Sequence, residues 1–111
     1  RQLMKLINRG FLLAKPKTAF IEWATQIDPE LMMDEDSEGS LYLIEEEFWD
    51  DDLIIEKYAK KIWAQECSNI EADPKNWPAL SETQTFTHFF HLELGCTVID
   101  LLKEPLEQEE L

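Results

Sequence analysis

The sequence predicts a single α+β domain in the order strand, helix, strand, helix, helix, strand (β-α-β-α-α-β), with about three strands and two to three covering helices. Short apolar runs between turn-forming residues are typical of buried strands, and apolar residues spaced three and four apart are typical of amphipathic helices. The 111 residues, 44% of them hydrophobic, suffice for one core. We therefore expect one domain over residues 1–111, with helices on at least one face of a three-stranded sheet.

The first 44 residues predict two strands and one helix. The apolar run 11–14, soon followed by a proline, predicts the first strand. Thr18 is suited to cap a helix that ends before Pro29. A second apolar run at 41–44 predicts the second strand. The residues that give the helix one apolar face are Phe20, Trp23, Ala24 and Ile27.

A longer helix is predicted from the acids at 50–52 to Cys67. Carboxylates at the start of a helix accept hydrogen bonds from its free backbone N–H groups and interact favourably with the helix dipole. Prolines at 74 and 78 indicate that a loop follows. The apolar residues that recur at helical spacing are Ile55, Tyr58, Ala59 and Ile62.

The last third of the chain predicts a helix, a strand and a tail. Ser81 and Gln84 fit a capping box that starts a helix, and Gly95 is expected to end it. Alternation over 96–102 predicts the last strand, and we expect the acidic tail 104–111 to be frayed. The apolar face of this helix consists of Phe86, Phe89 and Phe90.

Negative charge is concentrated in the middle of the chain. Residues 1–17 carry five bases and no acid, residues 18–56 carry fourteen acids and no base, and residues 57–111 carry five bases and ten acids, which gives the net charge of −14. Such a field repels phosphate backbones and anionic lipid surfaces. We therefore expect no nucleic-acid and no membrane partner.

The two cysteines and the apolar runs indicate a cytoplasmic protein. Cys67 and Cys96 fit reduced thiols better than a disulfide scaffold, which in a short chain usually has more cysteines. The apolar stretch at 11–14 is too short for the core of a signal peptide. No run approaches the roughly 20 apolar residues that cross a bilayer.

Several stretches of the chain form a recognisable set. They are residues 8–17 (NRGFLLAKPK) with Phe20 and Trp23, residues 40–44 (SLYLI), Trp77-Pro78, residues 86–90 and residues 98–101. Together they resemble a bacterial family of small acidic proteins whose function is unassigned, and the resemblance spans most of the chain. Its motifs are apolar strands and a Trp-Pro turn instead of catalytic residues. The resemblance implies an α+β domain without a known reaction.

Residues 34–45 match the spacing of a twelve-residue calcium loop. Asp34, Asp36 and Glu38 stand at positions 1, 3 and 5, a glycine and a leucine follow at positions 6 and 8, and Glu45 stands at position 12. A divalent cation bound by these four residues is our second functional hypothesis. The alternative is an acidic turn before a strand, which the single copy of the loop and the long side chain at position 5 favour.

A small enzyme that uses His88, His91 and Cys96 is the third hypothesis. Two histidines three apart on a helix can share a metal, and Cys96 or Glu93 could add a ligand. The sequence lacks a Cys-x-x-Cys or His-Glu-x-x-His pattern, so two surface histidines beside an aromatic core stripe are the favoured interpretation.

The first hypothesis is a non-catalytic interaction or regulatory module that meets a basic protein partner through its acidic face, residues 34–52. Trp49 stands between two acid runs, where it is either a staple for the following helix, the favoured interpretation, or an exposed anchor for a partner. Together with Asp50, Asp51 and Asp52 it forms the predicted partner-binding set. A homodimer formed through exposed aromatics or an uncovered sheet edge stays open.

Overall fold

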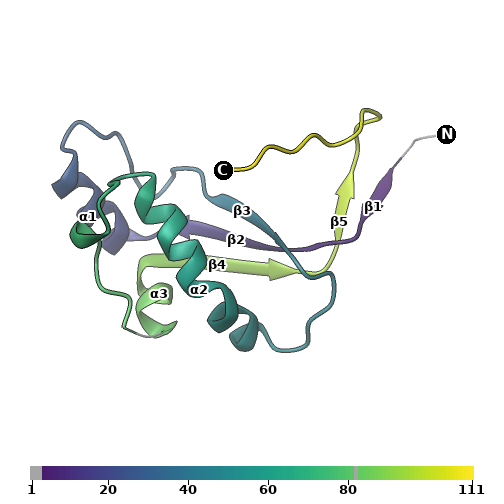
Figure 1. The fold of residues 1–111 in the computed structure, drawn as a ribbon, viewed down its shortest axis with the longest axis horizontal. Helices are drawn as coiled ribbons and strands as arrows, with labels where there is room; N and C mark the ends of the chain where they lie inside the picture. The colour runs from purple at the N-terminus through teal and green to yellow at the C-terminus, as the bar shows by residue number, and fades with distance from the viewer. Residues whose placement is uncertain (1–3, 82) are drawn as a thin grey trace.

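The computed structural model describes residues 4–81 and 83–111, and it confirms the α+β class (Figure 1). Three helices and one short 3-10 helix alternate with five strands in two small sheets. The elements in chain order are β1 (Lys5–Ile7), β2 (Gly10–Pro16), α1 (Thr18–Ile27), β3 (Ser40–Ile44), α2 (Asp51–Ser68), η1 (Pro74–Asn76), α3 (Thr83–Phe89), β4 (Phe90–Gly95) and β5 (Val98–Asp100).

The main sheet has the order β3-β2-β4, and both of its strand pairs are antiparallel. Burial alternates along the central strand β2, where every second residue from Gly10 to Pro16 is buried. Because successive side chains on a strand point to opposite faces, β2 has one buried face and one half-exposed face. We call these the inner face and the outer face of the main sheet.

The second sheet is a two-stranded ribbon formed by β1 and β5, which stand side by side at one end of the molecule (Figure 1). It continues the β2–β4 pair, but three residues separate Ile7 from Phe11 while only two separate Gly95 from Val98. An extra residue in one strand is a β-bulge, which bends the strand and strengthens its twist. The bulge therefore separates the ribbon from the main sheet.

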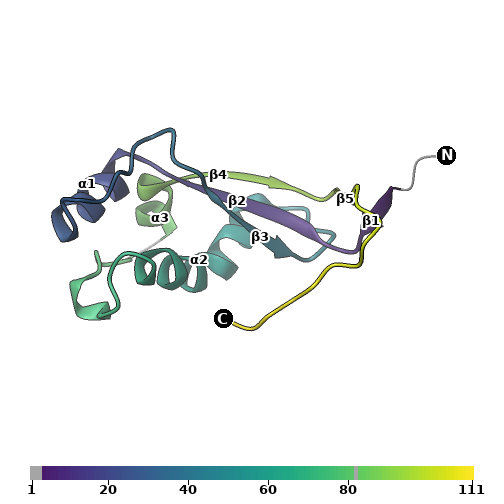
Figure 2. The same cartoon turned by 90° about the horizontal axis from the view of Figure 1, so that it is seen from above.

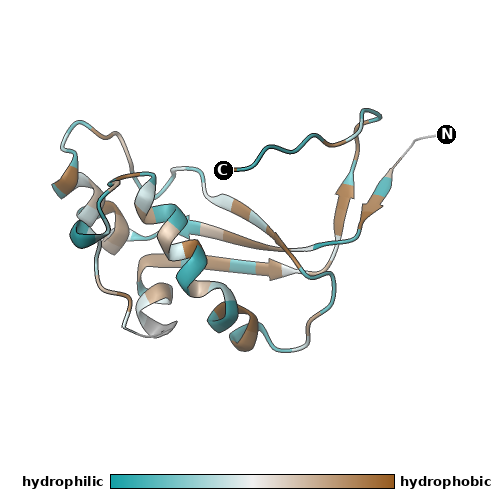
Figure 3. Ribbon diagram, viewed as in Figure 1, coloured by the Kyte–Doolittle hydropathy of each residue, from teal (hydrophilic) through white to brown (hydrophobic). Residues whose placement is uncertain are grey.

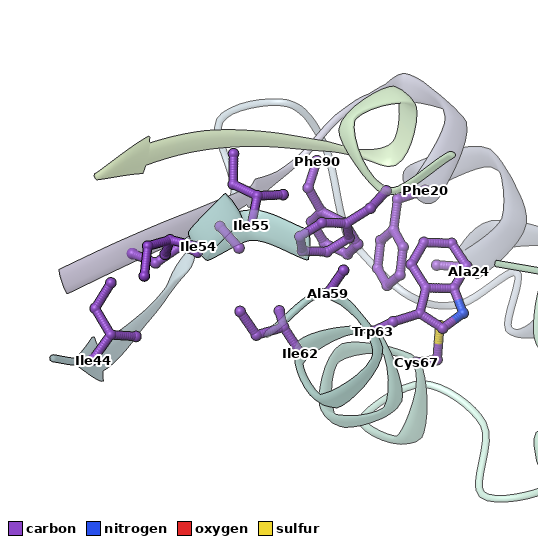
Figure 4. Close-up of a cluster of buried hydrophobic side chains, with 13 residues drawn as sticks. Phe20, Ala24, Ile44, Ile54, Ile55, Ala59, Ile62, Trp63, Cys67 and Phe90 are labelled. Carbon is purple, nitrogen blue, oxygen red and sulfur yellow. The ribbon is translucent and has the colours of Figure 1, made fainter. Parts of the chain in front are cut away.

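The core lies between the inner face of the sheet and the helices. Figure 2 shows α2 and α3 on the same side of the three strands, and Figure 4 shows the side chains that fill the space. Leu12, Phe86 and Cys67 are fully buried there. The other buried apolar side chains are Ala14, Phe20, Ala24, Ile44, Ile54, Ile55, Ala59, Ile62, Trp63 and Phe90.

Helix α2 begins where the sequence predicts. Asp50 is its N-cap, and the Asp50 carboxylate accepts hydrogen bonds from the backbone N–H groups of Asp52 and Leu53 at 3.0 and 3.4 Å. Asp51 and Asp52 lie in the first turn, where negative charge is favourable. The helix runs one residue beyond Cys67, so the prediction for this element is confirmed.

The predicted helix up to Gly95 is wrong in its second half. Helix α3 ends at Phe89, and residues from Phe90 form β4, in which Phe90, Leu92 and Leu94 face the inner side. The spacing of the phenylalanines continued the helical pattern to residue 90 and hid the alternation that follows. Ser81 contacts Thr85 through their hydroxyl groups at 3.1 Å, whereas the side chain of the predicted capping partner, Gln84, lies outside the described residues.

The two ends of the chain also differ from the prediction. The last strand covers only Val98–Asp100 instead of 96–102, and it pairs with β1, a three-residue strand that the sequence did not indicate. Residues 101–111 form no helix or strand and are exposed. Figure 3 shows that much of this tail is hydrophilic, while β2, β4 and β5 carry most of the hydrophobic positions of the strands. Fraying of the tail stays a prediction.

The Phe11 ring lies across Gly95 on the neighbouring strand, and this contact generates the first prediction. A Cβ atom added at Gly95 would lie 2.5 Å from the edge of the ring. Gly95→Ala should therefore lower the free energy of unfolding by about 1–3 kcal/mol. Urea unfolding followed by circular dichroism measures the change.

The control for this prediction is the same substitution in a Phe11→Leu background. Leucine lacks the outer ring atoms that meet the added Cβ, so Gly95→Ala should cost less there than in the natural sequence. Equal costs in the two backgrounds would show that the ring contact is not the cause.

Candidate functional site

The segment between β3 and α2 holds the densest acid run of the chain and the exposed Trp49. The backbone N–H of Gly10 donates to the carbonyl of Glu45 at 3.2 Å, which fixes the start of the segment against β2. A Cβ atom at Gly10 would lie 2.6 Å from that carbonyl oxygen and 3.2 Å from the Phe48 ring. The absence of a side chain at Gly10 therefore allows the segment to pack this closely.

Glu45 is tied to the first half of α2. Its carboxylate accepts a hydrogen bond from the Lys57 ammonium at 2.7 Å and another from the Tyr58 hydroxyl at 2.5 Å. These two bonds, that from Lys57 first, lower the pKa of Glu45 to about 2. The bond from its hydroxyl to Glu45 in turn raises the pKa of Tyr58. Glu45 is thus a structural link between β3 and α2.

Trp49 differs from the other three tryptophans in its surroundings. The indole N–H groups of Trp23, Trp63 and Trp77 each donate to a backbone carbonyl of the segment 71–78, at 3.0, 3.3 and 2.7 Å. The Trp49 side chain is 97% exposed. Of the two interpretations of Trp49, the exposed position agrees with an anchor and contradicts a staple. The neighbouring Phe48 is the residue that packs against the core.

A hollow of about 200 Å³ lies beside Trp49. Cys96, which lies in the turn between β4 and β5 and is far from Trp49 in the sequence, also lines this hollow. The site therefore combines an aromatic face, two carboxylates and an exposed thiol. The residues that line the hollow are Glu46, Glu47, Phe48, Trp49 and Cys96.

The predicted partner-binding residues separate into two kinds. The Asp50 carboxylate caps α2, so Asp50 has a structural role. Trp49, Asp51 and Asp52 are all exposed at the start of the same helix. All four residues are exposed where the segment 45–50 meets α2, and Asp50 is the one with a structural role as the cap. Partner binding by these residues stays a prediction.

The four predicted calcium ligands do not converge. Asp34 forms a turn in which its carboxylate accepts from the backbone N–H of Asp36 at 2.9 Å. Strand β3 then extends over five residues, roughly 16 Å, before Glu45 is reached, and Glu45 binds Lys57 and Tyr58. Across residues 4–81 and 83–111 no group of three or more potential ligand side chains is gathered for a metal. Cation binding by these residues stays a prediction, which a calorimetric titration with Ca²⁺ tests.

The three candidate enzyme residues lie on different elements. His88 is in α3 and borders a hollow of about 470 Å³ with Lys17 and Glu35, whereas His91 is on β4, so the two histidines do not share a helix. His91 faces Glu93 at 3.5 Å on the same strand. Cys96 follows the far end of β4, five residues or roughly 17 Å beyond His91. The prediction that one helix carries both histidines is wrong. The enzymatic hypothesis therefore loses the shared helix face on which it placed His88 and His91.

A buried polar pair was missed by the sequence interpretation. Glu66 of α2 is 8% exposed and accepts a hydrogen bond from the Tyr42 hydroxyl of β3. Burial first, and then Glu66, raise the pKa of Tyr42 above its usual value. The signal was present, because Glu66 stands four residues after Ile62 and so continues the apolar face of the helix.

No family model, no curated protein and no solved structure matches this chain. The resemblance to a bacterial family of small acidic proteins therefore stays an expectation. In the part of the chain that the structure covers, no helix has both the length and the apolar character that spanning a bilayer requires.

The two thiols should differ strongly in reactivity. Cys67 is fully buried, and burial, helped by Glu66, raises the pKa of its thiol to about 12, whereas Cys96 is exposed. Titration with a coloured thiol reagent at pH 8 should label only Cys96 quickly in the folded protein, and both cysteines in denaturant. Cys96→Ser should abolish the fast reaction. Rapid labelling of two thiols in the folded protein would contradict this burial.

The Glu45 link should make part of the stability depend on pH. Because the pKa of Glu45 falls from 4.5 in the unfolded chain to about 2 in the fold, the link stabilises the fold fully above pH 4.5 and is lost as the pH falls through 2. Glu45→Gln should therefore lower the unfolding temperature modestly at pH 7 and very little near pH 2. Thermal unfolding at both pH values measures this, with Glu46→Gln as the exposed control. If Glu45→Gln lowered the unfolding temperature equally at pH 7 and near pH 2, the link would be contradicted.

Proposed function

We propose that this protein is a non-catalytic interaction module that meets a basic protein through its acidic face, residues 34–52. The observation that carries the proposal is the fully exposed Trp49, placed between the acids at 45–47 and those at 50–52. Large aromatic side chains at a surface are the commonest anchors of protein interfaces. Flanking carboxylates give such an anchor a preference for positive partners.

The hollow beside Trp49 suits the end of a lysine or arginine side chain. A cation over an indole ring is attracted by its π electrons, and a guanidinium or ammonium group also forms charge-assisted hydrogen bonds with carboxylates. Glu46 and Glu47 supply such carboxylates at the wall of the hollow. We infer that a basic side chain of the partner enters here, while Asp51 and Asp52 extend the negative surface.

The charges indicate the class of partner, and the cysteines indicate the location. The acidic field disfavours nucleic acids and anionic lipids as partners. Cys67 and Cys96 are unpaired in the structure, one buried and one exposed, which fits a reducing compartment. We therefore propose a cytoplasmic protein with a protein ligand.

A pull-down with the immobilised chain tests the proposal. Proteins retained from a cell extract should have basic surfaces, and they should be released as NaCl rises from about 0.05 to 0.5 M, because salt screens exposed charges. Trp49→Ala should reduce retention by a factor of roughly 30, the effect of losing a 2 kcal/mol anchor.

Leu102→Ala is the matched control, since Leu102 is an exposed apolar residue outside the acidic face. It should leave retention unchanged. Retained partners that are insensitive to both salt and Trp49→Ala would remove the proposal.

A further inference from the structure

The outer face of the main sheet is apolar although no described helix covers it. Strand pairing places Phe11 beside Leu43 and Leu13 beside Leu41. Phe11 and Leu13 alternate with the buried positions of β2, so this set lies on the outer face, and α2 and α3 lie on the other side of the strands (Figure 2). Leu41 and Leu43 are 57% and 50% exposed. Exposed apolar patches of a few hundred Å² are often interaction sites.

The tail does not cover this face. Leu111, its last residue, borders a hollow of about 300 Å³ between β3 and α2, together with Tyr58, Lys61 and Gln65 of the helix. Figure 2 shows the tail running past the main sheet on the side of the helices. Within the described residues, neither the helices α2 and α3 nor the tail therefore covers the outer face.

The charges on the outer face balance, in contrast to the rest of the molecule. Lys15 of β2 and Glu93 of β4 are the two permanently charged residues that the strand register places on it. The whole chain carries −14. A second copy is repelled by the acidic face, but on the outer face it meets apolar side chains and a net charge of zero, with Lys15 of one copy available to Glu93 of the other.

We propose that two copies of this chain associate through their outer sheet faces. In such a dimer the same patch serves both partners, as two-fold symmetry requires. The two sheets would form the centre of a four-layer structure, with the helices of each copy outside. The acidic face with Trp49 lies elsewhere on each copy and stays free for its own partner.

The small size of the patch points to a weak association. Three strands of up to seven residues, spaced about 4.8 Å apart, span a plane of roughly 300 Å² on each copy. This area is below that of a standard stable interface. We therefore expect a weak dimer that is populated only at high protein concentration.

Sedimentation equilibrium of the intact chain from about 10 µM to 1 mM tests the dimer, with the concentration range chosen for a weak interface. The mass should rise with concentration from 13.1 kDa towards twice that value. Raising NaCl from about 0.05 to 0.5 M should strengthen the association, because salt screens the repulsion between two acidic copies. This sign is opposite to the salt effect expected for a basic partner.

Two matched variants locate the interface. Leu43→Glu should weaken the association by roughly tenfold or more, because it would bury an unpaired charge among the apolar side chains of the interface. Leu53→Glu adds the same charge at an exposed leucine of α2 and should leave the association unchanged. Circular dichroism of each variant shows that it is folded, and Leu41→Lys provides a second substitution on the same face if Leu43→Glu unfolds.

Four results would overturn the dimer. The first three are a mass of 13.1 kDa that persists at 1 mM, an association that Leu43→Glu and Leu53→Glu weaken equally, and an association that salt weakens. A monomer that binds a different protein through the outer face would also overturn it. The pull-down through Trp49 is independent of every one of these results.

Discussion

The arrangement of this protein depends on one aromatic cluster between the helices and the inner face of the sheet. The Phe90 ring, at the junction of α3 and β4, contacts Phe20 of α1 with ring centroids 4.6 Å apart and Phe86 of α3 at 5.5 Å. Trp63 of α2 meets Phe89 edge-on at 5.1 Å. One cluster thus joins all three helices to the sheet, and it holds α2 and α3 on one side of the strands (Figure 4).

Because the cluster gathers α2 and α3 on one side, the two surfaces of the molecule differ in character. The segment 45–50 connects β3 to the start of α2. At Glu45, the backbone carbonyl is held by Gly10 and the carboxylate by Lys57. Further along the same segment, the side chain of Trp49 points into solvent. The outer sheet face, by contrast, has no helix from the described chain and little net charge. A charged anchor site and a neutral apolar face are suited to different kinds of partner.

Local patterns predicted most of the fold. The apolar runs at 11–14 and 41–44 lie inside β2 and β3, and the capping acids predicted the start of α2 at the correct residue. The junction between Phe89 and Phe90 was missed because Phe90, the first residue of β4, also continues the helical spacing of Phe86 and Phe89. Strand β1 is only three residues long and exists through its pairing with β5, which local sequence does not encode.

The candidate site was predictable to a lesser degree, since it depends on long-range contacts. The exposure of Trp49 could be proposed from its acidic neighbours, but the hollow it shares with Cys96 joins residues 47 positions apart. The spacing of Asp34, Asp36, Glu38 and Glu45 suggested a loop around a cation, but the strand between Ser40 and Ile44 extends the chain there. Side-chain spacing predicts convergence only when the backbone between the residues is curved.

Hydrogen exchange read residue by residue tests most directly whether the aromatic cluster holds the molecule together. We expect the slowest amides in β2, β4 and the part of α2 around Trp63, and fast exchange in β1, β5 and residues 101–111, which lie outside the cluster. A ribbon of β1 and β5 that exchanges as slowly as β2 would contradict this dependence and place the stabilising core elsewhere.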